Sequence, residues 1–570
     1  MNTQRSSDAP AGAEARTLPD LLLRNCRDFA DSVCLVDPPN RARVAQGDAQ
    51  RLTWAQLGQR VDRMALVLVD QGIKKGEIVL LAAPTLHETL VVQLACLRLG
   101  IIVASFPVQY REAEVGGYVR RLSPRAMIGH ARLGKHANAA MLLDIARGHD
   151  APLPVLSFGI SDLPQGVIAL EPDAARALDA HEARRLRDAY ARADIQPDDV
   201  AFIVFTSGTS AAPKAVPRTQ AVLFHMRRFL HDTADFPQGG CFLSPRMLNT
   251  IGALANGISS WLFSAARMVL HHPFDIEVFL EQIATERPEV TSCPPAILTL
   301  MLERIDQGGG GVDLSSLHHI TTGSAQLNPR LITEFRDRFG IDLINVYGSS
   351  EGAMLVASVA DVPDAADRAH YFPRLNDGPR PSKLPILAQY TTRLVDPATD
   401  QPITEPGMIG ELRLKGGPIL ERYWDDPEGT AAAFDAEGWF RTGDLFSLAG
   451  EASEYLQFTG RLKHIIVRGG LNISAEEIQV LAQTHPAVAD AVAVAVPDAT
   501  MGEKVGLAVT LRGGASLTLP ELCAHLTDTA RIAVFKLPEY FCVLDELPVL
   551  PSGKTDQNAV RALFRAPPKH

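Results

Sequence analysis

Apolar and polar positions alternate along the first 300 or so residues in a way that predicts helices and strands in turn. Thr53 can cap a helix whose apolar positions recur at spacings of three and four residues and which ends near Gly72. The uninterrupted apolar run at 78–83 predicts a strand buried on both faces. A second helical pattern runs to Gly100, and a strand is expected at 101–104. Repetition of this unit predicts an α/β fold with mostly parallel sheets.

The composition changes at two places farther along the chain. Residues 361–387 are rich in Asp, Pro, Arg and Ala and have little periodicity, which predicts a loop or connection. The segment 461–470 is basic and ends in paired glycines. We therefore expect an N-terminal domain at 17–460, a small C-terminal domain at 461–570 and a hinge near Lys463.

Local patterns at the two ends of the chain differ. In the C-terminal region a helix is expected from Ser474 to about Gln483, a strand at 488–496 and a second helix near 518–528. Residues 1–16 are polar and Ala-rich with no apolar core, so they predict a disordered tail and not a signal peptide.

The composition is that of a soluble protein with a large core, since 46% of the residues are hydrophobic and 21% are charged. The formal net charge is -11 and no Lys- or Arg-rich run occurs, which argues against nucleic acid as a partner. Seven scattered cysteines without a C-x-x-C pair argue against a disulfide framework or a zinc ribbon and fit a reducing compartment. The sequence contains no apolar stretch of about 18 residues, which is the length that would predict a membrane span. We expect a cytoplasmic enzyme, a monomer or homodimer, whose anionic substrates meet local positive charge.

A loop rich in small hydroxyl residues follows the strand expected at 201–205. Its residues are Thr206, Ser207, Gly208, Thr209 and Ser210, and it continues to Lys214. Backbone N–H groups around a glycine can curl round phosphate oxygens, and hydroxyls and a lysine add further donors. The loop is not a Walker A motif, because Pro213 precedes the lysine and Ala215 follows it. Taken alone, it is either a phosphate-binding loop or an ordinary flexible turn.

Four further segments combine residue types that suit a nucleotide. Residues 345–352, Asn-Val-Tyr-Gly-Ser-Ser-Glu-Gly, place an aromatic ring, a hydroxyl and a carboxylate behind an apolar strand at 341–344. Residues 438–444 set an acid behind a glycine turn, which suits a diol such as ribose. The set is completed by 458–463, Phe-Thr-Gly-Arg-Leu-Lys, and by 551–554, Pro-Ser-Gly-Lys. Each segment alone is more often structural than functional.

Together and in this order, the five motifs resemble those of the adenylate-forming enzymes, the family of acyl- and aryl-CoA synthetases, peptide-synthetase adenylation domains and luciferases. The resemblance spans roughly residues 20–560. It implies a large N-terminal domain of stacked sheets with flanking helices, beside a small mobile C-terminal α+β domain. It also implies that the enzyme uses ATP and Mg²⁺ to convert a small carboxylic acid into an acyl-adenylate, and then passes the acyl group to a thiol such as that of coenzyme A.

The resemblance gives a role to each matched residue. The loop at 206–214 would bind the β- and γ-phosphates, and Tyr347 would stack on adenine. Ser350 would approach the α-phosphate, where the family usually has threonine, and Glu351 would help hold Mg²⁺, a hard cation that prefers oxygen ligands. Asp444 would accept hydrogen bonds from both ribose hydroxyls. The other implied nucleotide contacts are Gly323, Ser324, Ala325, Asn345, Val346, Gly348, Ser349 and Arg461.

Lys554 looks like the mobile catalytic lysine that this family uses for adenylation. The reaction is an in-line attack of a carboxylate on a phosphorus that carries negative oxygens, so two anions must approach each other. The nucleophile is already ionised, and therefore the reaction needs preorganised cations and no protein base. One well-placed charged donor lowers the barrier by roughly 3 kcal/mol.

The same resemblance implies that the small domain swings about Lys463 for thiol transfer. The lysine face would be replaced by one carrying Gly469 and Gly470, whose missing side chains let a pantetheine arm pass close to the backbone. CoA is the favoured acceptor, and the phosphopantetheine of a separate carrier protein is the alternative.

The identity of the acid stays open at this stage. The segments 213–219 and 472–478 resemble the aryl-acid-activating branch of the family, in which a Pro-x-x-His-Asn element lines the acid pocket. The matching element is 245–249, where Leu248 replaces the histidine and Asn249 is placed to hydrogen-bond a ring substituent. A hydroxybenzoate, a less polar aryl acid, an alicyclic acid and a medium-chain acid are the alternatives.

The phosphate loop departs from the family pattern at two positions that are usually glycine, Ala211 and Ala215. Alanine tolerates positive φ poorly, so we expect a stiffer or slightly different loop and slower catalysis. The departure leaves open a family member that binds nucleotides with weak or no turnover. A kinase-like NTPase is disfavoured, because it needs a Walker lysine followed by Ser or Thr.

Overall fold

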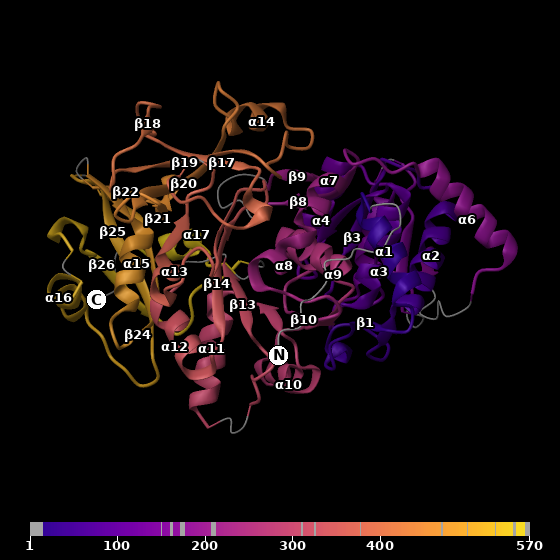
Figure 1. Ribbon diagram of the computed structural model, residues 1–570, viewed down its shortest axis with the longest axis horizontal. Coiled ribbons are helices and arrows are strands. Elements are labelled where there is room, and N and C mark those ends of the chain that lie inside the picture. Colours follow the sequence, from indigo (N-terminus) through magenta and orange to yellow (C-terminus); the bar gives the residue numbers. More distant parts are fainter. Residues whose placement is uncertain are drawn as a thin grey trace, which may run out of the picture.

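Figure 1 shows the chain as a computed structural model in which four β-sheets are flanked by helices. The described residues are 15–149, 151–159, 163–170, 177–206, 213–308, 312–323, 327–376, 378–468, 471–498, 500–530, 532–550 and 554–564. The predicted N-terminal tail therefore falls outside them, apart from its last two residues. None of the helices in these ranges has the length and apolar composition that crossing a membrane requires.

The seven-stranded sheet is parallel except at one edge, where β9 runs against β8. Its strands, in order across the sheet, are β7 (Ile168–Leu170), β6 (Val155–Phe158), β5 (Ala126–His130), β3 (Ile78–Ala82), β4 (Ile102–Phe106), β8 (Val200–Phe205) and β9 (Ala215–Thr219). In β3, Leu80 packs into the core of α4 (Glu112–Leu122) and α5 (Asn138–Arg147). Leu81 packs on the opposite face, into the core that includes α2 (Trp54–Asp70) and α3 (His87–Leu99). Apolar side chains thus cover both faces, as a parallel sheet requires.

The eight-stranded sheet is also parallel in its middle, with antiparallel strands at both edges. Its strands, in order, are β15 (Met354–Ala357), β14 (Asp342–Gly348), β13 (His319–Gly323), β12 (Val290–Ser292), β10 (Cys241–Ser244), β11 (Arg267–Leu270), β1 (Val33–Val36) and β2 (Arg51–Thr53). One face packs on α10 (Ile276–Glu286), α11 (Pro295–Asp306) and α12 (Pro329–Phe339). The other face, which includes Phe242 and Ile344, joins the core that contains Leu81. One continuous core therefore holds the first two sheets together.

The six-stranded sheet is antiparallel throughout and adds its apolar face to the same core through Leu412, Leu414 and Phe446. Its strands, in order, are β16 (Tyr371–Pro373), β21 (Tyr455–Arg461), β20 (Phe440–Ala449), β19 (Ile409–Gly416), β17 (Tyr390–Val395) and β18 (Pro402–Ile403). The short 3-10 helix η5 (Leu462–His464) follows β21 and contains Lys463.

The last sheet lies on the opposite side of the molecule from α2 and α3 (Figure 1). Its strands are β23 (Leu471–Ser474), β22 (Ile465–Arg468), β25 (Gly502–Leu511), β24 (Val488–Asp498) and β26 (Tyr540–Leu544). The helices α15 (Ala475–Gln483), α16 (Leu519–Asp528) and α17 (Gln557–Leu563) accompany it. Its two apolar cores contain only residues from Ile466 onward. The boundary at residue 461 and the hinge remain predictions.

The remaining described helices lie before or between these strands in the chain. They are α1 (Leu18–Asp28), α6 (Ala180–Ala193), α7 (Gln220–His225), α8 (Phe229–Ala234), α9 (Ser259–Phe263), α13 (Ala365–His370), α14 (Pro427–Ala433), the 3-10 helices η1 (Arg41–Arg43), η2 (Met226–Arg228), η4 (Pro385–Leu387) and η6 (Val534–Lys536), and the π-helix η3 (Gly252–Ile258).

The local predictions from periodicity are confirmed. The Oγ1 of Thr53 caps α2 by accepting a hydrogen bond from the backbone N–H of Gln56, at 3.3 Å. Gly100 ends α3 with a φ of 65°, in the left-handed region that favours glycine. Ser474 caps α15 by accepting from the backbone N–H of Glu477.

The prediction of a loop at 361–387 is wrong in part, because α13, β16 and η4 lie within it. Arg368 of α13 is completely buried and donates to the carbonyl oxygens of Val362 and Pro363, while also pairing with Asp342 of β14 at 2.8 Å. The buried position of α13 is occupied by an arginine and not by an apolar residue. Hydrophobic periodicity therefore cannot predict this helix, because the partners that neutralise the arginine lie elsewhere in the fold.

Candidate functional site

The two ends of the predicted phosphate loop are fastened to each other where β8 and β9 begin their antiparallel pairing. The backbone N–H of Thr206 donates to the carbonyl of Lys214 at 3.0 Å, and the N–H of Lys214 donates to Thr206 Oγ1 at 3.2 Å. Ser207, Gly208, Thr209, Ser210 and Ala211 lie outside the described residues.

The departure from glycine at Ala215 has no backbone cost. Ala215 is a buried residue of β9 that pairs with Phe205, and its φ is not positive. Its carbonyl accepts a hydrogen bond from the backbone N–H of Trp424 at 2.9 Å. Ala215 therefore adds no backbone strain, and the expectation of a stiffer loop stays a prediction.

Lys214 and Glu351 approach the same tyrosine. The Nζ of Lys214 lies 4.4 Å from the centroid of the Tyr423 ring, within cation–π range. The Tyr423 hydroxyl donates to Glu351 Oε1 at 3.0 Å, and burial and the Glu351 charge together raise the pKa of Tyr423. Tyr423 thus links the loop anchor to the predicted metal ligand, a role that sequence reasoning missed.

The turn that carries Glu351 is held by a buried arginine. Gly352 has a φ of 103°, and a Cβ there would lie 2.0 Å from the carbonyl oxygen of Pro418, so only glycine fits. The Nη2 of Arg218 donates to the same oxygen at 2.9 Å. Arg218 is 2% exposed, and burial lowers its pKa to about 10. Its Nε and Nη1 find no hydrogen-bond partner among the described residues.

Asp444 is the centre of a second group of polar contacts. Its Oδ2 accepts a hydrogen bond from the Tyr347 hydroxyl at 2.6 Å, and its Oδ1 lies 3.0 Å from the Nε of Arg461. Asp444 and Arg461 are directly opposite each other on β20 and β21, while Tyr347 belongs to β14. Burial raises the pKa of Asp444, and Arg461 and Tyr347 counteract that effect. The predicted adenine and ribose residues are therefore joined in one hydrogen-bonded unit.

Asp444 lies in a bulge inside β20, downstream of the predicted glycine turn at Gly438. The pairing of β19 with β20 shifts register there. Gly443 has a φ of 68°, and its N–H donates to Glu411 Oε1 at 3.1 Å. Such a bulge re-aims the next side chain. Similarly, Tyr347 lies within β14 and pairs with Leu355, whereas the sequence placed it after the strand.

Lys554 comes from the far end of the chain to the same region. Desolvation is the largest cause that lowers the pKa of Lys554, although the residue as a whole is exposed. The charges of Arg461 and Lys463 lower this pKa further, and those of Asp444 and Glu351 raise it. The backbone N–H of Leu550 donates to the Lys554 carbonyl at 2.7 Å, which fastens Lys554 to Leu550. The structure therefore brings together predicted site residues that are more than 200 positions apart in the chain.

Several predicted nucleotide contacts have other neighbours or fall outside the described residues. The Nδ2 of Asn345 donates to the carbonyls of Arg368 and Ala369, at 3.1 and 3.3 Å, and so fastens α13. The Ser349 hydroxyl is buried and has no hydrogen-bond partner among the described residues. Ser350 is half-buried in the turn beside Glu351. The other residues stand as follows: Gly323, Val346 and Gly348 are in β13 and β14, and Ser324, Ala325, Gly469 and Gly470 lie outside the described ranges.

The predicted acid-binding element places its two residues differently. Leu248 is 1% exposed and belongs to the central core, and its carbonyl accepts from Gln93 Nε2 at 2.9 Å. Asn249 is only half-buried, but its Oδ1 is buried and unpaired within the described part of the chain. An unsatisfied buried acceptor is costly, so Asn249 is suited to receive a hydrogen bond from a ligand.

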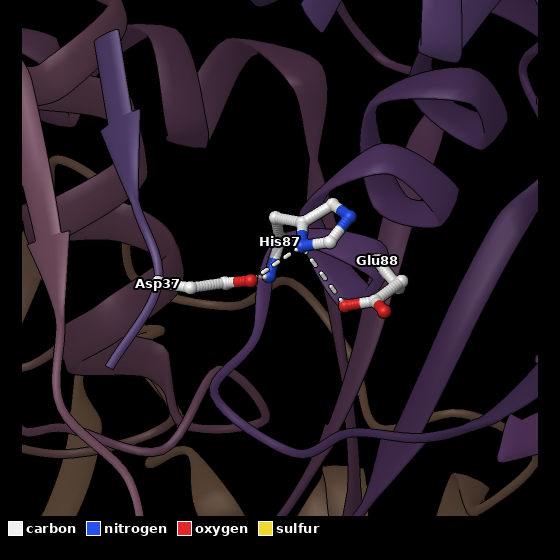
Figure 2. A group of neighbouring side chains, drawn as sticks. All are labelled: Asp37, His87 and Glu88. Carbon is white, nitrogen blue, oxygen red and sulfur yellow. Dashed lines mark hydrogen bonds and ion pairs between the residues drawn. The ribbon is translucent and has the colours of Figure 1, made fainter. Parts of the chain in front are cut away.

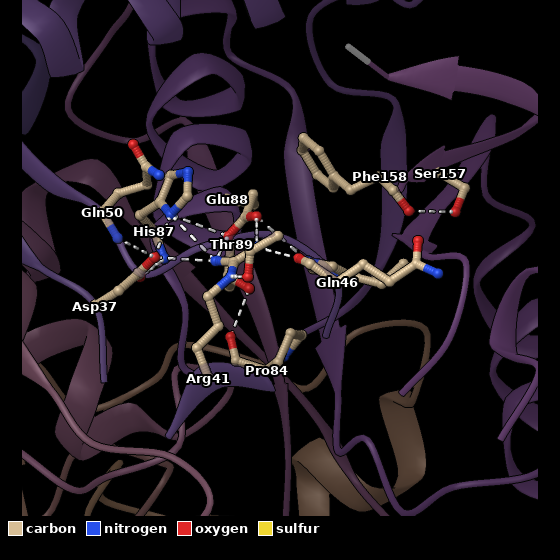
Figure 3. Close-up of polar contacts among 12 residues, drawn as sticks. Asp37, Arg41, Gln46, Gln50, Pro84, His87, Glu88, Thr89, Ser157 and Phe158 are labelled. Atoms are coloured by element: carbon tan, nitrogen blue, oxygen red, sulfur yellow. Dashed lines mark hydrogen bonds and ion pairs between the residues drawn. The ribbon is translucent and has the colours of Figure 1, made fainter. Parts of the chain in front are cut away.

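A group of buried charges, which we call the Asp37 cluster, consists of Asp37, Arg41, His87, Glu88 and His130. Of the described residues, only Asp37, His87 and Glu88 bring three potential metal-ligand atoms within 4.8 Å of one another (Figure 2). The Nη1 of Arg41 lies 2.9 Å from Asp37 Oδ2 and 2.9 Å from Glu88 Oε2 (Figure 3). Its guanidinium already supplies the cation that two buried carboxylates need, so the cluster is structural.

Burial has opposite effects on the pKa values of His130 and Glu88, two members of this cluster. It is the main cause that lowers the pKa of His130 to about 4. Burial alone would raise the pKa of Glu88, but His87, Arg41 and His130 outweigh it, so the pKa is lowered. Neither nitrogen of the His130 ring has a hydrogen-bond partner among the described residues.

Two family models match most of the chain. The family model described as AMP-binding enzyme matches residues 22–424, and that of the AMP-binding enzyme C-terminal domain matches residues 477–554. The 2-hydroxy-7-methoxy-5-methyl-1-naphthoate–CoA ligase of Streptomyces carzinostaticus is 30% identical over 96% of this chain and 93% of that protein. The salicylyl-CoA synthase / salicylate adenylyltransferase of a Streptomyces species is 30% identical over 94% of this chain and 92% of its own length.

Among solved structures, that of ATP-bound MatB from Rhodopseudomonas palustris superimposes with a TM-score of 0.75. The match covers 96% of this chain and 99% of that one, at 23% sequence identity. It shows a shared fold across nearly the whole chain.

We expect acid pH to destabilise the protein through His130. Its pKa is about 4 in the folded state, against an ordinary 6.5, so the unfolded chain binds a proton that the folded chain does not between these values. The free energy of unfolding should therefore fall by about 2 kcal/mol between roughly pH 6.5 and pH 5. Urea denaturation at a series of pH values measures this slope. His130→Leu should flatten it and the exposed His318→Leu should not, and an unchanged slope in His130→Leu would contradict the assignment.

Proposed function

This chain belongs to the AMP-binding enzyme family, and we propose that it is an aryl-acid–CoA ligase. Its activity is that of an ATP-dependent, AMP-forming carboxylic acid–thiol ligase. The finer parts of the proposal are the residues that perform each step, the class of acid and the use of Mg²⁺.

The observation that carries the proposed mechanism is the convergence of charged side chains around Asp444. Lys554 is close enough to Asp444 and Glu351 for both carboxylates to affect its pKa, although the three residues come from separate parts of the chain. Arg461 and Lys463 add positive charge to the same place. A chain with a net charge of -11 gathers cations where a triphosphate and a carboxylate must meet.

In the first half-reaction, a carboxylate oxygen of the acid attacks the α-phosphorus of ATP. An O–P bond forms, the bond from the α-phosphorus to the bridging oxygen breaks, and pyrophosphate leaves with the electron pair. Lys554 would stabilise the charge on the α-phosphate and on the entering carboxylate, and Lys214 the charge on the leaving group. Tyr347 and Asp444 would hold the adenosine in place for this in-line attack.

Glu351 suits a magnesium ion that also binds phosphate oxygens. Its Oε1 accepts from Tyr423, while its Oε2 accepts no hydrogen bond from the described residues. Mg²⁺ commonly uses only one or two carboxylates, with waters and substrate phosphates completing its coordination. When bound, the ion would supply positive charge to the phosphates.

In the second half-reaction, a thiol loses its proton to solvent and its sulfur attacks the carbonyl carbon of the acyl-adenylate. A C–S bond forms, the bond from the carbonyl carbon to the phosphate oxygen breaks, and AMP leaves with the electron pair. We propose that the C-terminal residues move about Lys463 between the two steps, so that Gly469 and Gly470 replace Lys554 beside the acyl group. CoA is the proposed acceptor, and a carrier protein is the alternative.

The class of acid follows from Asn249. Its unpaired Oδ1 needs a donor, and a hydroxyl beside the reacting carboxylate of an aromatic acid supplies one. The naphthoate and salicylate in the names of the two relatives are acids of this kind. We therefore propose an ortho-hydroxylated aryl acid and place the alicyclic and medium-chain acids second.

Lys554→Ala should slow adenylation about 100-fold or more, because it removes the charge that offsets two approaching anions. Thioester formation from a synthetic acyl-adenylate should change less than about threefold, since no phosphate is then attacked. Pyrophosphate exchange and thioester assays measure the two steps separately. Lys504→Ala, which removes a half-buried ion pair with Asp498, is the control. Equal losses in both steps would rule out the role given to Lys554.

Asp444→Ala should raise the apparent KM for ATP by about 10- to 100-fold, because charge-assisted hydrogen bonds contribute about 1.5–3 kcal/mol. Tyr347→Phe removes only the hydroxyl that donates to Asp444, and it should raise the apparent KM for ATP about fivefold. Thermal melting of each variant checks that the sheet is intact. If neither variant alters the KM for ATP, the ribose assignment fails.

A panel of acids tests the proposed substrate class. In pyrophosphate exchange, 2-hydroxybenzoate should exceed benzoate, cyclohexanecarboxylate and octanoate. Asn249→Ala should reduce the rate with 2-hydroxybenzoate about tenfold more than the rate with benzoate, because only the former donates to Oδ1. An equal reduction for both acids would contradict the contact with Asn249.

A further inference from the structure

Two charged side chains of the candidate site, Lys214 and Glu351, contact one buried tyrosine from different sides. The Nζ of Lys214 lies 4.4 Å from the centroid of the Tyr423 ring, and the Tyr423 hydroxyl donates to Glu351 Oε1 at 3.0 Å. No ion pair joins Lys214 to Glu351, although both side chains belong to the described part of the chain. Opposite charges beside the same ring attract each other, so their separation needs a cause.

A second tyrosine shows the alternative arrangement of the same three groups. The hydroxyl of Tyr190 also donates to a carboxylate, Asp62 Oδ1, at 2.9 Å, and the guanidinium carbon of Arg98 lies 3.8 Å from the centroid of its ring. There the arginine and the aspartate also form an ion pair with each other. The two charges at Tyr190 are thus neutralised within the protein, whereas each charge at Tyr423 is held by a neutral partner.

The main chain on both sides of Tyr423 is fixed by contacts of its own. The backbone N–H of Leu420 donates to the Glu351 carbonyl at 2.7 Å, which fastens the segment to the turn that carries the acid. The backbone N–H of Trp424 donates to the Ala215 carbonyl at 2.9 Å, which fastens it to β9. The Tyr423 hydroxyl is therefore not needed to hold the segment in place.

We propose that Tyr423 is a positioning residue for adenylation, which keeps Lys214 and Glu351 apart so that neither neutralises the other. A phenol suits this task because its hydroxyl donates to a carboxylate while the negative face of its ring attracts an ammonium group. Lys214 then stays available for phosphate oxygens and Glu351 for a magnesium ion. This inference rests on the proposed function, since it assumes that these two side chains serve ATP.

The experiment measures the binding of ATP without metal, in EDTA, so that the result does not depend on turnover. Isothermal titration calorimetry gives the dissociation constant of each variant. Tyr423→Leu removes both contacts, and Lys214 should then pair with Glu351. The dissociation constant for ATP should rise about 10-fold, because the lysine loses its phosphate contact. The Mg²⁺ concentration that gives half-maximal pyrophosphate exchange should rise about fivefold, because the carboxylate is occupied.

A second substitution separates this mechanism from a loss of structure. Glu351→Gln removes the carboxylate that would capture Lys214. In the Tyr423→Leu background it should therefore restore the metal-free ATP affinity to within about threefold of that of Glu351→Gln alone. A merely structural role cannot be rescued by the removal of an acid. If the double variant binds ATP as weakly as Tyr423→Leu does, the role of Tyr423 is overturned.

Two further variants are controls. Tyr190→Phe removes the corresponding hydroxyl beside an ion pair that is already formed, and it should change the ATP affinity and the Mg²⁺ dependence less than about twofold. Tyr423→Phe keeps the ring beside Lys214, so it should weaken metal-free ATP binding only about threefold and respond to Glu351→Gln in the same way. This variant decides the question if thermal melting shows that Tyr423→Leu does not fold.

The outcomes also distinguish this inference from the function on which it rests. If the wild type neither binds ATP nor supports pyrophosphate exchange with any acid, the proposed function itself is wrong. If the wild type does both, and the Tyr423 variants bind ATP and respond to Mg²⁺ as the wild type does, only the role of Tyr423 is overturned. A weakened ATP affinity that Glu351→Gln restores supports that role.

Discussion

The carboxylate of Asp444 is the point on which the arrangement of the site depends. It lies in the six-stranded sheet, accepts a hydrogen bond from Tyr347 of the eight-stranded sheet and pairs with Arg461 just before η5. A buried carboxylate is tolerated only with such partners. The need to satisfy this one group therefore ties two sheets and the start of the C-terminal region to a common geometry, and the bulge at Gly443 sets the direction in which Asp444 points.

Cations outnumber anions around this carboxylate. The pKa values of Lys463 and Lys554 are both lowered, in the first place by burial and then by Arg461. Positive groups that lower one another's pKa repel each other, so holding them together costs free energy. A bound polyanion offsets this repulsion. It follows that ATP should favour the arrangement in which Lys554 lies beside Asp444, and that loss of pyrophosphate should weaken it. The same electrostatics can thus serve the chemistry and the later movement of the small domain.

The sequence predicted the features that depend on neighbouring positions. Caps such as Thr53, buried strands such as β3 and the ordered motifs of the family all followed from residues close together in the chain. It did not predict Tyr423 or Arg218, because their importance comes from partners far away in sequence: Glu351 in one case and the Pro418 carbonyl in the other. A single tyrosine or arginine outside a motif carries no local signal. The exact setting of Asp444 was missed for a related reason, since a bulge is a property of two paired strands.

The buried arginines show how this fold separates structure from binding. Arg41 lies between Asp37 and Glu88, and Arg413 between Glu411 and Asp435, so each of these guanidinium groups is neutralised within the protein. Arg218 is also buried but forms no ion pair within the described ranges, and burial lowers its pKa. It is next to the turn of Glu351. Where an arginine only stabilises the fold, the chain supplies its counter-charge. Arg218 lies beside the groups assigned to ATP, where the substrate itself brings negative charge.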